Sequence, residues 1–197
     1  MTYNMIVAFD INRGIGKDNK IPWNIPEDLK RFSKLTKGNG NGNNAIVMGR
    51  NTWDSLPKKP LLKRDNLILS TTLKLEENTP KNNLIKSFDN ILNLHKFCEE
   101  QKYDAVWIIG GSKIYEQYIN HDKINKLYIT FVLKEYDCDT YFPNISGWKL
   151  SDNVLDNSQD NLSVYYQIYE KREYQVSDFT PSTPTMNECT HLPDLLY

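Results

Sequence analysis

Residues 21–32, with the sequence IPWNIPEDLKRF, combine a proline, a tryptophan and a carboxylate at the start of a predicted helix. Pro26 suits the first turn of a helix, and Asn24 followed by Glu27 forms a candidate capping box. The helix that begins here carries Asp28 in its first turn. A carboxylate in this place can accept charge-assisted hydrogen bonds from a ligand that offers two donors side by side.

The face of the helix on which Asp28 lies indicates why a ligand would bind there. At 100° per residue, Asp28 falls in one arc with Leu29, Phe32 and Leu35. Burying an ionised carboxylate is costly unless paired donors meet it, and no Arg or Lys is expected on this face. The missing partner is then a ligand. The alternative is that Asp28 points to water and only favours the helix dipole, worth roughly 0.3–1 kcal/mol.

Composition limits the classes of function. A chain of 197 residues with 39% hydrophobic residues can bury one good core. The 24 basic and 25 acidic residues are spread throughout, so neither nucleic acid nor an anionic membrane is an expected partner. The 3 cysteines and 3 histidines are scattered, so no metal site and no histidine-based nucleophile triad is predicted. Small-molecule chemistry is the better expectation.

The same residues bear on localisation. An odd number of cysteines without a pairing pattern fits a reducing, cytosolic setting. No window approaches about 18 uninterrupted apolar residues, and no basic segment precedes the first apolar run. The chain is therefore expected to be cytoplasmic, neither secreted nor spanning a membrane.

Strands and helices are predicted to alternate along most of the chain. Short apolar runs bounded by turn residues are typical of buried strands, and longer amphipathic stretches are typical of helices. Strands are expected at residues 5–9, 45–48, 66–69, 84–88 and 105–109. Helices are expected after Asn24, at GRNTWDSL with Thr52 or Asn51 as the cap, at 89–102 and at 112–119. This alternation indicates an α/β layer with a largely parallel centre.

The C-terminal part follows another pattern. Residues 126–133 and 163–170 are rich in Tyr, Ile, Val and Phe with no helix between them, so they are expected to be antiparallel partners at one edge. The predicted fold is an α/β open mixed sheet, mostly parallel with an antiparallel C-terminal edge, flanked by helices. One catalytic domain is expected over residues 1–174, followed by a proline-, serine- and threonine-rich tail or linker at 175–197.

Two further segments are predicted to be loops. Residues 10–20, DINRGIGKDNK, have no periodicity and are more than a tight connection needs, so they are predicted to act as a lid. The tract KGNGNGNN at 37–44 is predicted to be a surface excursion, and no function is assigned to it.

Six segments, in order and at similar spacing, resemble dihydrofolate reductase: IGKDNKIPWNIPEDLKRF, IVMGRNTWDSL, RDNLILSTT, VWIIGGSKIYEQY, KLYIT and CDTYFP. The resemblance covers about residues 3–172, and six segments in register are far more specific than one. It implies a dihydrofolate-reductase-like fold. It also implies NADPH-dependent reduction of 7,8-dihydrofolate to 5,6,7,8-tetrahydrofolate, in support of one-carbon metabolism and thymidylate synthesis.

The resemblance implies which ligand the Asp28 carboxylate binds. Asp28 matches the family's ionisable side chain in the pterin pocket, which accepts two hydrogen bonds from the ring's amide-like nitrogen and amino group. Thr130 would steady this carboxylate, although a β-branched residue also suits a strand for packing alone. The catalytic set implied is Asp28, Trp23, Thr130 and Ile21, with the proton arriving through water admitted near Trp23 and Ile21.

The resemblance also implies contacts with the rest of the substrate. Phe32 would pack on the benzoyl part, although aromatic residues at helical spacing are usually core. Arg64 matches the arginine that grips the glutamate α-carboxylate, whereas a lone arginine is otherwise read as solvated surface. Ile6, Ala8 and Ile109 would form apolar walls around the reacting rings, with the last two close to the nicotinamide.

NADPH is the cofactor that the resemblance implies. Gly110 and Gly111 match the family's diglycine, joined by a non-proline cis peptide where absent side chains let the backbone approach the cofactor, although a bare glycine pair is often only a turn. Arg50 would be the main cation for the 2′-phosphate that distinguishes NADPH from NADH. The cofactor-binding residues implied are Ala8, Ile15, Gly16, Gly49, Arg50, Asn51, Thr52, Ser70, Thr71, Ile109, Gly110, Gly111, Ser112, Lys113, Ile114 and Tyr115.

The chain departs from the family pattern at positions that bear on function. Asn51 stands where a lysine or histidine is usual, which predicts a shallower preference for NADPH. Ile21 replaces the residue that names the family's mobile loop in bacteria. Asp139 matches the acid that pins that loop shut through backbone donors, and a plain turn-capping aspartate is the alternative.

Two other functions are weighed against this one. A pyrimidine reductase of riboflavin synthesis shares the fold and uses NADPH, but it is not expected to carry the Pro-Trp segment followed by a helical acid. A non-catalytic nucleotide-binding or regulatory module would be expected to lack Asp28 or the diglycine, and both are present. A monomer is expected, and the tail offers a place for fusion to, or partnership with, thymidylate synthase.

Overall fold

The computed structural model of the chain describes residues 1–38, 43–75, 83–159 and 162–172. Part of the tract at 37–44 lies outside the described residues. The predicted domain end at residue 174 and the whole predicted tail at 175–197 also lie outside them.

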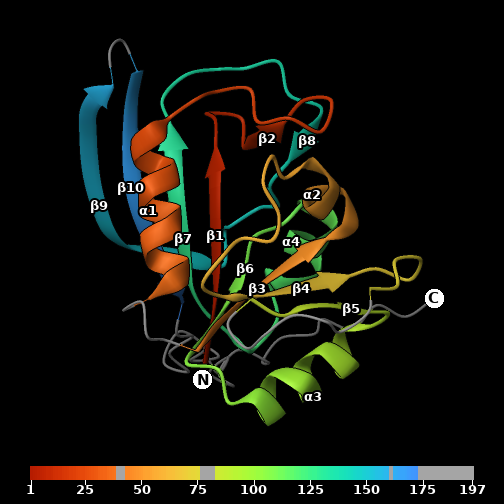
Figure 1. The fold of residues 1–197 in the computed structure, drawn as a ribbon. Helices are drawn as coiled ribbons and strands as arrows, with labels where there is room; N and C mark the ends of the chain where they lie inside the picture. Colours follow the sequence, from red (N-terminus) through yellow and green to blue (C-terminus); the bar gives the residue numbers. More distant parts are fainter. Residues whose placement is uncertain (39–42, 76–82, 160–161, 173–197) are drawn as a thin grey trace, which may run out of the picture.

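A mixed sheet forms the centre of the described chain (Figure 1). Its strands are β1 (Thr2–Phe9), β3 (Asn44–Gly49), β4 (Asp65–Leu69), β5 (Ile85–Phe88), β6 (Ala105–Ile108), β7 (Ile124–Val132), β9 (Trp148–Gln159) and β10 (Leu162–Lys171). Their order across the sheet is β5-β4-β3-β6-β1-β7-β10-β9. The pairs from β5 to β7 are parallel, and the pairs of β10 with β7 and β9 are antiparallel. The predicted fold class is confirmed.

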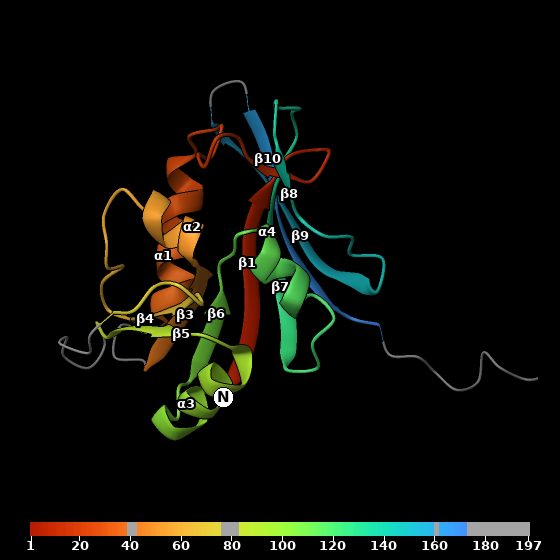
Figure 2. The same cartoon turned by 90° about the vertical axis from the view of Figure 1, so that its right-hand side faces the viewer.

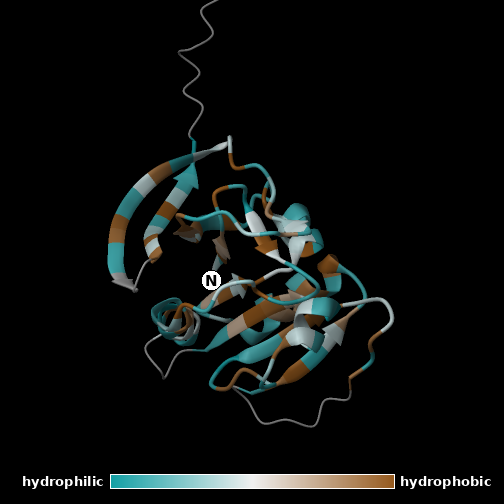
Figure 3. Ribbon diagram, turned by 90° about the horizontal axis from the view of Figure 1, so that it is seen from above, coloured by the Kyte–Doolittle hydropathy of each residue, from teal (hydrophilic) through white to brown (hydrophobic). Residues whose placement is uncertain are grey.

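Two predictions about strands are wrong. β10 is not at the edge, because β9 pairs with its far side. β9 was not predicted, because it contains the polar runs SDN and DNSQ. Asp and Asn are depleted in strands, so this segment does not show a strand pattern. Figure 3 shows hydrophilic and hydrophobic segments alternating along β9 and β10. The predicted loop at 10–20 contains the short strand β2 (Gly14–Gly16), which pairs with β8 (Thr140–Tyr141) and is too short to show a period.

The helices are α1 (Pro26–Lys37), α2 (Arg50–Ser55), α3 (Ile91–Gln101) and α4 (Ser112–Tyr118). Asn24 does not cap α1: because Pro26 is the first helical residue, the N-cap is Ile25, which has no side-chain hydrogen bond to the helix. The predicted cap of α2 is also wrong. Gly49 is its N-cap, and Asn51 and Thr52 lie inside the helix.

Alternation along the central strands divides the core between the two faces of the sheet. On β1, Met5 and Val7 belong to the cluster that contains Leu94 of α3 and Tyr118 of α4. Ile6 belongs to the opposite cluster, which packs against residues of α1 and α2. Figure 2 shows α1 and α2 on one side of β1 and α4 on the other. The face that carries Ile6 is therefore the one that α1 covers.

Over the described residues, every helix is too short or too polar to cross a bilayer. In the same part of the chain, no group of His, Cys, Asp and Glu side chains is placed to hold a metal ion.

Candidate active site

Asp28 lies in the first turn of α1, where the helix meets β7. Its Oδ1 atom accepts a hydrogen bond from Thr130 Oγ1 at 2.5 Å. Thr130 is 1% exposed and pairs in register with Ala8 on β1 and Tyr166 on β10, so three strands fix its position. No other described side chain or backbone group donates to the carboxylate. The sheet thus holds one oxygen of Asp28 and leaves Oδ2 without a described protein donor.

Arg31 corrects the expectation that no cation lies near this carboxylate. Its Nη1 atom donates to Thr130 Oγ1 at 3.3 Å, and its Cζ atom lies 4.7 Å from the ring centre of Tyr166. Arg31 follows Asp28 by three residues, so the two are neighbours on the helix surface, and its long side chain bends toward the sheet. The arginine contacts the threonine that holds the carboxylate.

Burial governs the protonation of this pair. It raises the pKa of Asp28, whereas the Thr130 hydroxyl and the charge of Arg31 act to lower that pKa. Burial also lowers the pKa of Arg31, against the charge of Asp28. In both groups desolvation is the largest cause, so the charged form is under-solvated. A ligand that brings further donors to Asp28 would relieve that cost.

The predicted apolar wall residues lie together on the face of the sheet that α1 covers. Ile6 is 5% exposed, and its carbonyl accepts a hydrogen bond from the Tyr115 hydroxyl at 2.8 Å. Ile6 and Ile109 belong to one apolar cluster. Ala8 is half-buried and is the β1 neighbour of Thr130. These residues extend the site from the carboxylate across β1 to the end of β6.

Phe32 and Arg64 meet farther along α1. Phe32 is half-buried against the same cluster, and Arg64 Cζ lies 5.6 Å from its ring centre. Arg64 is only 4% exposed, which excludes a solvated surface arginine. Its Nη1 atom donates to Thr36 Oγ1 and to the Ser33 carbonyl, while Nε has no hydrogen-bond partner among the described residues. Burial lowers the pKa of Arg64 to about 10, and a carboxylate would satisfy its unpaired donor.

Trp23 and Ile21 differ in how firmly they are held. Trp23 is half-buried, with its ring centre 5.2 Å from that of Tyr136. Ile21 is 60% exposed. Leu29, expected on the apolar face of α1, is 55% exposed, because the sheet covers a narrower arc than the helical wheel indicates. Trp23 therefore packs against the core cluster of Ile25, Val132 and Val164, whereas Ile21 and Leu29 are exposed.

The diglycine joins the two predicted cofactor loops. The peptide bond between Gly110 and Gly111 is cis, as predicted. The Gly110 carbonyl accepts a hydrogen bond from the Gly49 amide at 2.8 Å. Gly110 has a φ of 101°, and a Cβ there would lie 2.7 Å from the Tyr115 ring. A Cβ on Gly111 would lie 3.3 Å from Thr52 Oγ1, so both loops meet through residues without side chains.

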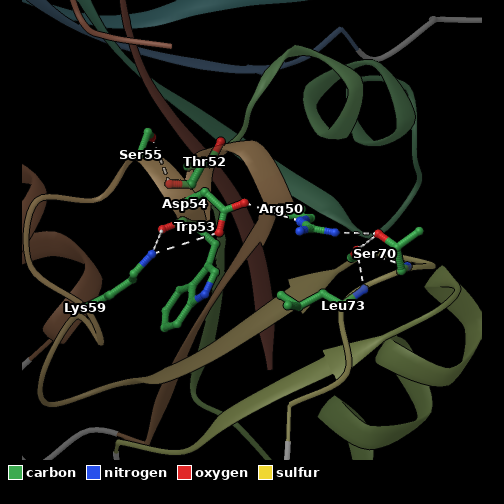
Figure 4. Close-up of polar contacts among 9 residues, drawn as sticks. Arg50, Thr52, Trp53, Asp54, Ser55, Lys59, Ser70 and Leu73 are labelled. Carbon is green, nitrogen blue, oxygen red and sulfur yellow. Dashed lines mark hydrogen bonds and ion pairs between the residues drawn. The ribbon is translucent and has the colours of Figure 1, made fainter.

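Arg50 is held at the start of α2 by two side chains. Its Nη1 atom donates to Thr72 Oγ1 at 2.8 Å, and its Nε atom donates to Asp54 Oδ2 at 3.3 Å. Ser70 Oγ accepts the backbone N–H groups of Thr72 and Leu73 at 3.3 and 3.1 Å. Figure 4 shows Arg50 between Asp54 and the turn that begins at Ser70. An exposed cation beside several hydroxyls results.

For the other predicted cofactor-binding residues, the structure gives mainly their burial and few contacts. Ile114 is buried beside Gly49, and Ser112 and Lys113 begin α4, the first half-buried and the second exposed. Asn51 and Thr71 are exposed. The place of Thr71 beside the ribose stays a prediction, and its neighbour Thr72 contacts Arg50. The run Ser-Thr-Thr offers three hydroxyls and does not indicate which one contacts Arg50.

The predicted lid contains the short strand β2 and is pinned at several points. Ile15 packs against the main core. The Asp18 amide donates to Asp139 Oδ2 at 2.9 Å, and the Asp139 amide donates to the Gly16 carbonyl at 3.0 Å. The Asp18 amide is also the main cause of the lowered pKa of Asp139. The predicted contact between Asp139 and this loop is confirmed.

Asp10 is a buried residue that sequence reasoning missed. It is 0% exposed, and its carboxylate accepts the amides of Asn12 at 2.9 Å, Gly14 at 2.7 Å and Tyr136 at 3.0 Å. The available signal is an acid placed directly after a buried strand. Asp10 thus ties the loop after β1 to the segment after β7.

Comparison with known proteins adds independent findings. A family model described as dihydrofolate reductase matches residues 2–171. A dihydrofolate reductase of Drosophila melanogaster is 41% identical over 182 residues, covering 87% of this chain and 98% of the relative. A dihydrofolate reductase of Mus musculus is 36% identical over 183 residues, covering 86% of this chain and 97% of the relative. The bifunctional dihydrofolate reductase-thymidylate synthase 2 of Arabidopsis thaliana is 38% identical over 150 residues, covering 73% of this chain and 26% of that protein.

The family match spans the chain from β1 to β10, and these two reductases align over most of their own length. The chain therefore belongs to the dihydrofolate reductase family.

Proposed function

We propose that this chain catalyses the NADPH-dependent reduction of 7,8-dihydrofolate to 5,6,7,8-tetrahydrofolate, in support of one-carbon metabolism and thymidylate synthesis. Its family supports the reaction, and NADPH use is a general property of that family. The observation that carries the proposal to particular residues is the carboxylate of Asp28. One of its oxygens is held by Thr130, and the other has no described donor.

Asp28 accepts two hydrogen bonds from the pterin ring, one from its amide-like nitrogen and one from its amino group. Because burial disfavours the free anion, these two donors stabilise it more than they would in water. Thr130 keeps the carboxylate oriented, since its hydroxyl donates to Asp28 and accepts from Arg31. The Arg31 charge supports the anion from behind the threonine.

The rest of the substrate lies along α1. Ile6, Ala8 and Ile109 form the apolar walls, which exclude water from the reacting rings. Phe32 packs on the benzoyl group. Arg64 binds the glutamate α-carboxylate through its Nε and Nη atoms, and the unpaired Nε–H supports this role.

The cofactor-binding residues fit NADPH by the chemistry of their donors. Gly49, Gly110 and Gly111 let the backbone approach the cofactor, while Arg50 offers an exposed cation beside Ser70. The remaining contacts come from Ile15, Gly16, Asn51, Thr52, Thr71, Ser112, Lys113, Ile114 and Tyr115. When bound, NADPH supplies the hydride. Asp54 forms an ion pair with Arg50 and would compete with the 2′-phosphate for this cation. The preference for NADPH over NADH is therefore shallow.

The proton for the reduced ring nitrogen comes from water. Asp28 is occupied with the amide-like side of the ring and does not touch that nitrogen. Trp23 lines the site and Ile21 lies exposed beside it, so water reaches the ring between them. The protein mainly positions the reactants, which is a large part of what such a site contributes.

We further propose that the protein is a cytoplasmic monomer that needs neither nucleic acid nor a membrane. Residues 175–197 serve as a tail or a link to thymidylate synthase, an arrangement supported by the bifunctional relative of Arabidopsis thaliana. Co-purification of the tagged full chain with thymidylate synthase, lost on removal of residues 175–197, tests the link. Retention without the tail would contradict it.

The reaction itself is tested by following NADPH absorbance with the purified chain. Consumption is expected with dihydrofolate, none is expected without it, and a slower rate is expected with NADH. The absence of dihydrofolate-dependent consumption by folded protein would contradict the proposed function.

A further inference from the structure

Lys59 forms a second ion pair with the acid that holds Arg50. Asp54 Oδ2 lies 3.3 Å from Arg50 Nε, and Asp54 Oδ1 lies 4.0 Å from Lys59 Nζ. Each oxygen of the carboxylate therefore faces one cation, and Figure 4 shows Asp54 between Lys59 and Arg50. The three side chains are between 39% and 53% exposed, so a ligand can reach this row of charges.

Lys59 is held in place by contacts with Trp53. Its Nζ atom donates to the Trp53 carbonyl at 3.3 Å and lies 5.3 Å from the centre of the Trp53 ring. Trp53 is buried in the core beneath α2, which makes it a firm support. The carbonyl belongs to the last turn of α2, where a cation is favourable. Because these contacts do not involve Arg50, they keep the ammonium beside Asp54 independently of what Arg50 binds.

The guanidinium of Arg50 is only partly occupied. Its Nε atom donates to Asp54 and its Nη1 atom donates to Thr72 Oγ1, while Nη2 makes no hydrogen bond to a residue that the structure describes. A phosphate binds an arginine best through two of its N–H groups. It must then take Nε from Asp54 or stay close to that negative charge, and like charges at short range repel each other. Asp54 therefore weakens phosphate binding unless another cation compensates its charge.

We propose that Lys59 is a positioning residue that determines cofactor specificity through Asp54. When the 2′-phosphate of NADPH binds Arg50, the Asp54 carboxylate keeps Lys59 as its partner. Lys59 thereby reduces the penalty that Asp54 imposes on NADPH, and it has no such effect on NADH, which lacks this phosphate. The inference rests on the proposed function, because that function places the 2′-phosphate at Arg50.

The placement of the polar groups favours this indirect role over direct binding of the phosphate by Lys59. Thr72 contacts the guanidinium, and Ser70 accepts the Thr72 amide, so the hydroxyls of this turn gather at Arg50. Lys59 instead contacts the Asp54 oxygen that Arg50 does not contact. The two roles differ in one consequence: a lysine that binds the phosphate directly matters even when Asp54 has lost its charge.

The test measures the affinity of the full chain for NADPH and for NADH through the fluorescence of the bound nicotinamide, without substrate. Lys59→Met removes the charge and keeps an unbranched side chain over Trp53. It is expected to weaken NADPH binding about two- to fivefold, the range that one exposed ion pair supplies, and to leave NADH binding unchanged. Lys59→Arg keeps the charge and is expected to retain the wild-type ratio of the two affinities.

Two further variants make the test specific. Lys58→Met removes the same charge from the neighbouring exposed residue and is expected to keep the wild-type ratio. Asp54→Asn removes the group through which Lys59 acts. Adding Lys59→Met to Asp54→Asn is therefore expected to cause no further change in NADPH affinity, which is the result that coupling between the two residues requires.

An unchanged affinity ratio in Lys59→Met, or the same loss in Lys58→Met, would overturn the inference. Equal weakening of both cofactors would show that Lys59 only supports the structure, and an undiminished effect in the Asp54→Asn background would show direct contact with the phosphate. Either result would also overturn it. A failure of the proposed function shows separately, as no dihydrofolate-dependent oxidation of NADPH by the wild type, while the fluorescence measurement still reports cofactor binding.

Discussion

Asp28 and Thr130 are 102 positions apart in the chain and share a side-chain hydrogen bond, with 2.5 Å between Oδ1 and Oγ1. The threonine is fixed by three paired strands, whereas the carboxylate is carried by a helix laid over them. The sheet therefore sets the orientation of the Asp28 carboxylate. Arg31 adds a second contact to the same hydroxyl.

Replacing Thr130 by valine tests this relationship through pH. The Thr130 hydroxyl lowers the pKa of Asp28, so Thr130→Val is expected to raise that pKa and shift the acid limb of the kcat/KM profile to higher pH. Thr130→Ser keeps the hydroxyl and is expected to retain the wild-type limb. An unchanged profile in the valine variant would show that the hydrogen bond does not set the ionisation of Asp28.

The free energy of unfolding should also depend on pH through the ionisation of Asp28. Folding raises its pKa above the ordinary value of 3.8. Its contribution to stability is then fully present below that value and is lost as the pH rises through the folded pKa. Urea unfolding of wild type and Asp28→Asn from about pH 4 to about pH 7 should show the variant gaining stability relative to wild type. Parallel curves would contradict the raised pKa.

Arg50→Ala should separate the two nicotinamide cofactors. Removing the cation is expected to raise the KM for NADPH far more than the KM for NADH, because only NADPH carries the 2′-phosphate. Asp54→Asn is the companion variant. It frees Arg50 from its ion pair and is expected to lower the KM for NADPH. Equal effects of Arg50→Ala on both cofactors would remove Arg50 from the phosphate site.

Asp10→Asn should loosen the loop that follows β1. The Asp10 carboxylate accepts three backbone amides, and an asparagine must turn its own N–H₂ group toward one of them. The expected loss is about 1–3 kcal/mol in the free energy of unfolding. Asp122→Asn, at an exposed turn, is expected to cost little. A loss no larger than that of the control would mean that Asp10 does not anchor the loop.

The alternation of strands and helices could be read from the sequence because central parallel strands are buried on both faces. Runs such as residues 45–48 and 105–109 are apolar throughout and correspond to β3 and β6. β9 was missed because an edge strand needs apolar residues only where it meets the core. β2 was missed because three residues cannot show a period, and its pairing with β8 depends on a contact distant in sequence.

The site shows a similar division. Asp28 could be found from its place on a helical wheel, because an acid among apolar residues requires a partner. The contact of Arg31 with Thr130 was missed because a helical wheel records where Cα lies and not how far a long side chain reaches. Thr72 and Asp10 depend on how loops turn, and no periodic pattern records that.

The most direct test of the account is the turnover of dihydrofolate by Asp28→Asn, measured as NADPH oxidation near neutral pH. Asparagine keeps the shape of the side chain but loses the anion and one acceptor. We predict a fall in kcat/KM of roughly 10²-fold or more, with Asp122→Asn unchanged. Wild-type turnover by folded Asp28→Asn would contradict the assignment of this carboxylate to substrate recognition.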